Sequence, residues 1–264
     1  MNSIKFSTFV FFDTETTGLL REDFHPRITE LSMVAVNRVD LLNGVKTPRV
    51  QNKISLCFNP LSEFHPVAAK ISGLNIRNLQ TEKDFDENAV RQLELFIRRL
   101  NPPICIIAQN GYRFDFPLLQ AELLRVKYHS FDFLDCKENP VYCSDSLDLF
   151  KEFDDKLIPQ NTDESIDRSA DESLIEKFPH GRFSLSALSQ RVFGSIHVNA
   201  HNAEADCIAV IKLIQVLGDS ALSWLDSNYR KLSDIKTMYT VNESDPTPLP
   251  PDQFPIDHVQ SPCD

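Results

Sequence analysis

Three short acidic motifs in this chain of 264 residues contain side chains that could bind metal ions. The first is Asp13-Thr14-Glu15, which directly follows the apolar run at residues 9–12. Because residues two apart in an extended chain point to the same face, Asp13 and Glu15 are expected to project together. Two such carboxylates repel each other unless a cation lies between them, and oxygen ligands of this kind suit Mg²⁺ or Mn²⁺. The alternative is a turn in which the two acids cap a helix or face water.

The second motif is the segment NGYRFDFPLL, in which Asp115 lies between Phe114 and Phe116. A carboxylate among aromatic rings loses several kcal/mol if it is desolvated without a partner. Asp115 is therefore a candidate metal ligand. It could instead cap a helix that begins near Pro117, since proline is common in the first helical turn.

The third motif is HNAEAD, which precedes the apolar segment CIAVIKLIQVL. Asp206 falls in the first turn of the expected helix, where the helix dipole tolerates an acid. His201 lies on the loop that enters this helix, from which it could approach an attacking water without binding a metal itself. The alternative is a surface histidine followed by an ordinary first-turn aspartate.

The segments around these motifs predict a mixed α/β sheet, because buried strands and helices alternate along the chain. Residues 9–12, 28–39 and 50–58 are expected to be strands that form an opening meander, and residues 104–108 a further strand. The expected helices are residues 87–100, 116–126, 185–192 and 204–217. We expect one domain over residues 1–241, and a proline-rich, disordered tail over residues 242–264.

The formal net charge of −11 argues against a broad basic surface for nucleic acid. However, residues 151–178 contain nine acidic and only four basic residues, and we interpret residues 152–178 as an acidic, mobile insertion. A site that binds phosphates through metal ions also needs acids rather than bases. The charge alone therefore does not decide the partner.

The six cysteines form no CxxC pair, and several lie in apolar runs such as ICIIA. We expect buried free thiols in a reducing compartment, and hence an intracellular protein of the cytoplasm or nucleus. The chain has no apolar run of the roughly 18–20 residues that cross a bilayer, so no membrane association is expected. No His/Cys cluster has the spacing of a zinc hydrolase.

Together, FFDTETTG, NGYRFDFPLL and HNAEAD resemble the motifs of the DEDDh exonucleases. Within that superfamily the chain resembles the three-prime repair exonuclease (TREX) family, through AQNGYRFDFPLLQAEL, RFSLSALSQRVFG and ALSWLDSNYRKLSDIKTMY. The resemblance runs from about Phe9 to Tyr239, and it is to an invertebrate-like member without a proline-rich loop or membrane tail. It implies an RNase H-like exonuclease fold, in which helices flank a mixed central sheet.

The resemblance also implies roles for individual residues. The four carboxylates would hold two Mg²⁺ ions, for which Mn²⁺ could substitute, and His201 would be the general base. The implied ligands are Asp13, Glu15, Asp115 and Asp206. The implied substrate-binding residues are Glu15, Thr16, Leu19, Ile71, Phe114 and Asp206. Leu19 and Ile71 would wedge against the terminal bases, although ordinary core packing is the alternative. At Phe114 the relatives usually carry a tyrosine, so a hydroxyl contact would be missing here.

The implied activity is that of a 3′→5′ exodeoxyribonuclease that releases nucleoside 5′-monophosphates from single-stranded or frayed DNA 3′ ends. RNA 3′-end trimming is one alternative, because only contacts near the sugar 2′ position separate the two substrates. A catalytically silent nucleic-acid-binding module is the other, but the presence of all four acids and the histidine disfavours it. Family members are homodimers joined through sheet edges, and an exposed edge strand at 50–58 would suit such pairing.

Overall fold

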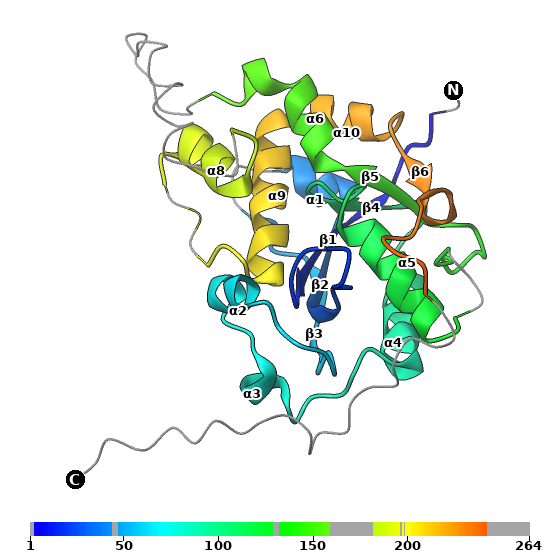
Figure 1. Cartoon of the computed structure of the whole chain (residues 1–264). Helices are drawn as coiled ribbons and strands as arrows, with labels where there is room; N and C mark the ends of the chain where they lie inside the picture. The colour runs from blue at the N-terminus through cyan, green and yellow to red at the C-terminus, as the bar shows by residue number, and fades with distance from the viewer. Residues whose placement is uncertain are drawn as a thin grey trace.

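The computed structural model describes residues 3–43, 47–128, 132–158, 182–195, 197 and 199–241. In this part of the chain a six-stranded mixed sheet has the order β3-β2-β1-β4-β5-β6 (Figure 1). The strands are β1 (Thr8–Thr16), β2 (Ile28–Asn37), β3 (Asn52–Cys57), β4 (Ile104–Ala108), β5 (Tyr142–Asp145) and β6 (Arg230–Lys231). β1 pairs antiparallel with β2 and parallel with β4, and β3 pairs antiparallel with β2. The predicted meander and mixed α/β sheet are confirmed.

Both faces of β1 are buried, which explains its continuous apolar run. Phe9 and Phe11 belong to one hydrophobic cluster, whereas Val10 and Phe12 belong to another on the opposite face. The strand continues beyond the predicted residues 9–12, because its ladder with β2 extends to Thr16. The first acidic motif therefore lies inside the strand rather than after it.

Helices cover the two faces of the sheet separately (Figure 1). The face of Val10 and Phe12 packs against α4 (Glu87–Arg98) and α5 (Asp115–Arg125). The face of Phe9 and Phe11 packs against α1 (Arg38–Leu42), α6 (Ser146–Glu152), α8 (Leu185–Phe193), α9 (Ala203–Leu217) and α10 (Asp219–Leu225). Two short helices, α2 (Pro66–Ser72) and α3 (Ile76–Leu79), join β3 to α4. The four predicted helices are confirmed to within two residues at either end.

The prediction of a mobile insertion over residues 152–178 is wrong for its first residues, 152–158, which the structure describes. Glu152 is the last residue of α6, and the 3₁₀ turn η1 (Asp154–Lys156) follows it. Asp154 forms ion pairs with Arg182 at 2.5 Å and with Arg191 at 2.9 Å, which joins the chain on either side of residues 159–181. Residues 159–178 of the predicted insertion and the predicted tail at 242–264 lie outside the described residues.

Five of the six cysteines lie in the described part of the chain, and all five are free thiols. Cys105, Cys143 and Cys207 are buried free thiols, whereas Cys57 and Cys136 are free but exposed. Within the described ranges, no single helix is long and apolar enough to cross a membrane; α9 and α10 reach that length and composition only as a pair bent by 110°.

Candidate active site

Asp13 and Glu15 extend the alternation of Phe9 and Phe11, so their side chains face α9. This confirms that the two acids of the first motif project to the same face. Both are partly buried at the end of β1. The turn or capping alternative is wrong, because β2 pairs with this segment through Glu15 and Thr16.

Asp115 is the first residue of α5, and it approaches the same end of β1 from the other face. Its Oδ1 accepts hydrogen bonds from the Thr14 backbone N–H at 3.1 Å and from Thr14 Oγ1 at 2.8 Å. The helix N-cap is Phe114, which forms no side-chain cap, so the capping alternative for Asp115 is wrong. The turn before α5 needs a glycine, because a Cβ on Gly111 would lie 2.5 Å from Ala108 Cβ.

The third motif begins α9. Asn202 is the N-cap, and Asp206 lies in the first turn, as predicted. The next residue, Cys207, donates from Sγ to the Phe11 carbonyl at 3.2 Å and so fixes this turn against β1. His201 has a left-handed backbone, with φ of 66°, and its N–H donates to Asp206 Oδ2 at 3.2 Å. This contact ties the loop that carries the histidine to the helix that carries the aspartate.

Of the three acidic motifs, the first and the third lie closest together, through Glu15, His201 and Asp206. Ligand atoms of Glu15, His201 and Asp206 all lie within 4.8 Å of one another. Asp13 and Asp115 are not in this set of three, but they are close enough for electrostatic interaction: the charge of Asp115 acts on both Asp13 and Glu15. The structure therefore brings all five predicted residues to one end of β1.

Burial and like charges make this cluster unfavourable in the absence of a cation. Burial, and then the charges of Asp115 and Asp206, raise the pKa of Asp13 well above its usual range. Burial and the charge of Asp206 raise the pKa of Glu15 to about 8. Burial also raises the pKa of Asp115 to about 7, although hydrogen bonds from Thr14 oppose this shift.

The donor set fits a hard divalent cation. In the described part of the chain, no Lys or Arg forms an ion pair with any of the four carboxylates. Carboxylate oxygens are the ligands that Mg²⁺ and Mn²⁺ take in proteins. Glu15 and Asp206 could hold one such ion beside His201, and Asp13 and Asp115 extend the oxygen-rich surface.

The predicted substrate-binding residues differ in accessibility. Leu19 is 67% exposed and Ile71 is 42% exposed, so core packing is the wrong interpretation for both. Thr16 is buried, and its hydroxyl donates a hydrogen bond to the Gly18 carbonyl at 2.8 Å. Phe114 is partly buried and packs against the core. Leu19 and Ile71 are therefore accessible apolar side chains, as are Leu20 and Val67 in the same two segments.

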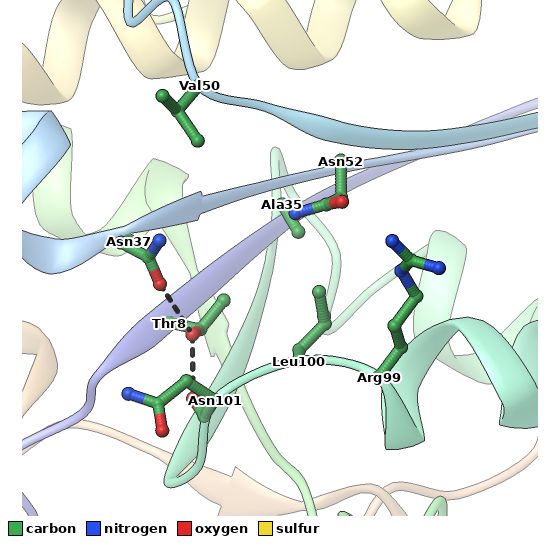
Figure 2. Close-up of a pocket in the computed structure, with 8 residues that line it drawn as sticks. All are labelled: Thr8, Ala35, Asn37, Val50, Asn52, Arg99, Leu100 and Asn101. Atoms are coloured by element: carbon green, nitrogen blue, oxygen red, sulfur yellow. Dashed lines mark hydrogen bonds between the residues drawn. The ribbon is translucent and has the colours of Figure 1, made fainter.

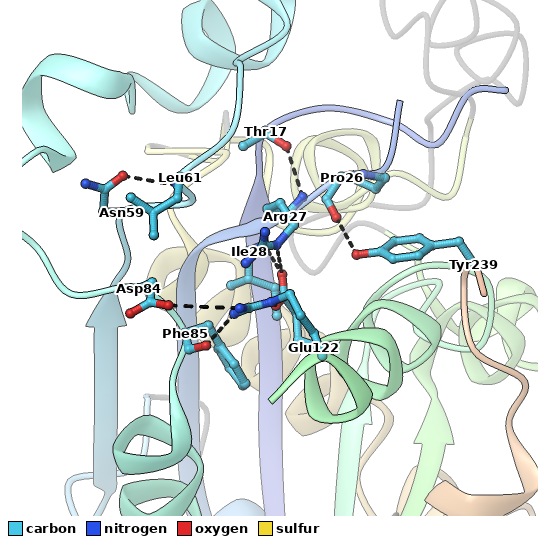
Figure 3. A network of polar contacts seen from close by, with 11 residues as sticks. Thr17, Pro26, Arg27, Ile28, Asn59, Leu61, Asp84, Phe85, Glu122 and Tyr239 are labelled. Atoms are coloured by element: carbon cyan, nitrogen blue, oxygen red, sulfur yellow. Dashed lines mark hydrogen bonds and ion pairs between the residues drawn. The ribbon is translucent and has the colours of Figure 1, made fainter. Parts of the chain in front are cut away.

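A buried ion-pair network anchors the loop that carries Leu19 (Figure 3). Thr17 and Arg27 close the loop at its base, because each backbone N–H donates to the other residue at 3.0 Å. Arg27 Nε then donates to Glu122 Oε1 at 2.8 Å, and Arg125 Nε donates to Glu122 Oε2 at 2.7 Å. Since Glu122 belongs to α5, this network fixes the loop relative to the helix that begins with Asp115.

Two further residues at the site were not predicted from the sequence. Glu30, on β2, lies directly opposite Glu15 in the ladder and contacts the start of α9. His197 Nε2 contacts Asp206 Oδ1, and its side chain is 8% exposed. A lone acid in the otherwise uncharged segment ITELSMVAV could have pointed to Glu30, whereas nothing in the local sequence pointed to the loop residue His197.

A cavity of about 190 Å³ lies at the other end of β1 (Figure 2). Its lining residues are Thr8, Ala35, Asn37, Val50, Asn52, Arg99, Leu100 and Asn101. Thr8 Oγ1 is hydrogen-bonded to Asn37 Oδ1 at 3.3 Å and to the Asn101 carbonyl at 2.7 Å. None of these described lining residues carries a carboxylate, so the cavity does not compete with the acidic cluster as a site for metal-dependent chemistry.

The chain is similar to characterised exonucleases in sequence. It is 32% identical over 249 residues to Three-prime repair exonuclease 1 of Homo sapiens, over 90% of this chain and 72% of that protein. It is 32% identical over 254 residues to Three prime repair exonuclease 2 of Homo sapiens, over 93% of this chain and 94% of that protein. No protein-family model matches the chain.

Solved structures confirm the predicted exonuclease fold. E. coli Exonuclease I in complex with a dT13 oligonucleotide superposes with a TM-score of 0.57 and 19% identity, over 81% of this chain. Exonuclease I from Methylocaldum szegediense superposes with a TM-score of 0.58 and 18% identity, over 83% of this chain. This chain spans about two fifths of each of those chains, 41% and 42% respectively.

Proposed function

Because this chain belongs to the three-prime repair exonuclease family, we propose that it is a metal-dependent 3′→5′ exodeoxyribonuclease. It removes nucleotides as nucleoside 5′-monophosphates and prefers single-stranded or frayed DNA ends. The observation that carries this proposal is the approach of Glu15, His201 and Asp206 to within 4.8 Å, beside two further carboxylates. A DNA substrate is supported by the solved neighbour that holds a dT13 oligonucleotide.

Each residue of the cluster has a role in this reaction. Asp13, Glu15, Asp115 and Asp206 would hold two Mg²⁺ ions, and Mn²⁺ would substitute. Such ions, when bound, stabilise the negative charge that develops on the scissile phosphate and its leaving oxygen. The exposed ring of His201 accepts a proton from the attacking water, since an imidazole exchanges protons near neutral pH. Water adds to phosphorus, the bond to the 3′ oxygen breaks, and the shortened strand keeps a 3′-hydroxyl.

Leu19 and Ile71 are proposed to contact the terminal bases. Their segments lie together, because the His65 N–H at the start of α2 donates to the Thr17 carbonyl at 2.8 Å. Exposed apolar side chains can pack on any base, so this contact suits an enzyme that does not select sequence. Phe114 could add ring contact with the substrate but no hydroxyl hydrogen bond.

We also propose a homodimer formed through β3. This strand forms one of the two edges of the described sheet, and its Asn52, Lys53, Ser55 and Cys57 are exposed. An unpaired edge presents backbone donors and acceptors that a second copy can complete. Light scattering after gel filtration should give twice the chain mass of 30.1 kDa, and a monomer mass would contradict the dimer.

Labelled oligonucleotides test the reaction. With Mg²⁺, 3′-labelled single-stranded DNA should release labelled mononucleotide at once, whereas 5′-labelled DNA should shorten as a ladder. EDTA should stop both, and the Asp115→Asn variant is the matched inactive control. Degradation that persists in EDTA, or that starts only at the 5′ end, contradicts the proposal. A matched RNA oligonucleotide degraded faster than DNA would reassign the enzyme to RNA trimming.

A further inference from the structure

Glu30 lies where a carboxylate should be unfavourable. It pairs with Glu15 in the antiparallel ladder between β1 and β2, so the two side chains share one face. Like charges directly opposite each other destabilise a sheet. Glu30 is also only 9% exposed, and burial raises its pKa. A structural reason for an acid at this position must therefore come from what its oxygens contact.

Both oxygens of Glu30 contact the start of α9. Oε2 accepts a hydrogen bond from the Ala203 N–H at 3.1 Å, and Oε1 accepts one from Asn202 Nδ2 at 3.3 Å. Ala203 is the first residue of the helix, so its N–H has no partner within the helix. A carboxylate at a helix N-terminus is further stabilised by the helix dipole. Glu30 thus fastens the beginning of α9 to β2.

The orientation of Asn202 requires an acceptor at Glu30. Asn202 Oδ1 accepts from the Ala205 N–H at 3.0 Å as the helix cap, so Nδ2 must face Glu30. Glu30 therefore receives a hydrogen bond at each of its two oxygens. A glutamine at this position would present its NH₂ group either to Asn202 Nδ2 or to the Ala203 N–H, and neither can accept.

We propose that Glu30 is a positioning residue for the exonuclease reaction: it fastens Asn202 and Ala203 so that His201 and Asp206 face Glu15. The residues on either side of this attachment carry the chemistry. His201 directly precedes Asn202, and its N–H donates to Asp206 Oδ2 at 3.2 Å. The inference rests on the proposed metal-dependent function, because it assigns Glu30 to the geometry of the metal ligands.

A hydrogen-bond exchange tests this role. Glu30→Gln places two NH₂ groups in opposition, and Asn202→Asp places two carboxylates in opposition. The double variant restores every contact: the new carboxylate at position 202 caps Ala205 and accepts from the glutamine NH₂, while the glutamine oxygen accepts from Ala203. It also keeps the net charge of the wild type. The positioning role therefore predicts mutual rescue, which loss of a single charge does not.

Steady-state kinetics on single-stranded DNA should show this pattern in kcat. Each single variant should lose about 10- to 100-fold in kcat, as is typical for residues that orient metal ligands, with KM for DNA changed less than about 2-fold. The double variant should return to within about 3-fold of the wild type. Glu204→Gln is the matched control, because Glu204 lies in the same helical turn but pairs with Lys53 at the surface. It should retain wild-type kcat.

Calorimetric titration with Mn²⁺ gives a reading that does not depend on cleavage. Affinity should fall in both single variants and recover in the double variant, and thermal denaturation should show that all four proteins fold. Wild-type kcat in the single variants, no rescue in the double variant, or an equal loss in Glu204→Gln would overturn the role of Glu30. If Mn²⁺ affinity follows this pattern across the four proteins but the wild type cleaves no DNA, the proposed exonuclease function fails. The role of Glu30 in positioning the metal ligands then still stands.

Discussion

Two sites in this protein contain buried carboxylates, and the two sites differ in whether a basic side chain pairs with them. Glu122 on α5 is fully buried, but Arg27 and Arg125 donate to its two oxygens at 2.8 and 2.7 Å (Figure 3). Asp13 and Glu15 on β1 have no basic partner among the described residues, and burial raises the pKa of each. The charge of Glu122 is compensated by its partners, so removing one partner would leave a buried charge unpaired, whereas the uncompensated charges of Asp13 and Glu15 destabilise the metal-free protein and are explained by a cation.

Asp13→Asn should produce the largest effect, because it removes a ligand charge and leaves the shape unchanged. We expect cleavage to fall at least ~10⁴-fold with Mg²⁺ present. The metal-free variant should melt at a higher temperature than the metal-free wild type, since one repelling charge is gone. Single-turnover cleavage and thermal denaturation in EDTA measure the two effects. A lower melting temperature for the metal-free variant would contradict this prediction, because it would show that Asp13 stabilises the metal-free protein.

Glu122→Gln should show the reverse pattern. Removing one member of a buried ion pair typically destabilises a protein by about 3–5 kcal/mol, because the two arginines are left opposite an amide. Urea denaturation measures this loss, and kcat should stay near wild type while the protein is folded. Glu138→Gln, at an exposed pair with Arg98, is the control and should leave the urea midpoint unchanged. A stable but inactive Glu122→Gln would contradict the comparison.

His201→Ala tests whether the histidine is a base or a metal ligand, since its ring lies within 4.8 Å of Glu15 and Asp206 ligand atoms. If His201 is the general base, the substitution should lower the cleavage rate by about 10²- to 10³-fold. Mn²⁺ affinity, measured by calorimetry, should stay close to that of the wild type. A loss of affinity as large as that of Asp206→Asn would identify His201 as a ligand instead.

The smallest predicted effect is on stability as a function of pH. The folded-state pKa values of Glu15, about 8, and Asp115, about 7, lie above the ordinary carboxyl range. The native state therefore binds more protons than the unfolded state, and stability falls as pH rises from the ordinary carboxyl pKa through these values. We expect the free energy of unfolding of the metal-free protein to fall steadily between about pH 4.5 and pH 8. Unfolding in EDTA measures this loss, which Mg²⁺ should largely prevent; a rise in stability over this interval would contradict the assignment.

The sequence predicted the elements whose pattern is local. The short, continuous apolar run before Asp13 indicated a strand buried on both faces. The longer apolar segment after Asp206 indicated a buried helix. The sequence did not predict β5 (YCSD), in which Cys143, Ser144 and Asp145 are buried by neighbouring strands rather than because of their own composition. The role of Asp115 as ligand or cap also depended on a tertiary contact with Thr14.

At the candidate site, the residues were predictable but their partners were not. Glu15 and Asp206 were candidates because each lies beside an apolar segment, and the resemblance to the DEDDh exonucleases implied their role as metal ligands. Glu30 and His197 approach them only through strand register and a loop path, which no local spacing encodes. The exposure of Leu19 and Ile71 likewise follows from the arrangement of loops around β1, not from their apolar side chains.

Asp154 forms ion pairs with Arg182 and Arg191, which lie on the far side of residues 159–181 in the sequence. Because Asp154 lies in η1 just after α6 and Arg191 lies in α8, these contacts hold the end of α6 next to α8, and the number of residues between positions 158 and 182 has little influence on how the two helices meet. Evolution can therefore lengthen or shorten this stretch with little effect on the nuclease core. The same place offers an internal position for an epitope or fluorescent label, remote in sequence from the three acidic motifs.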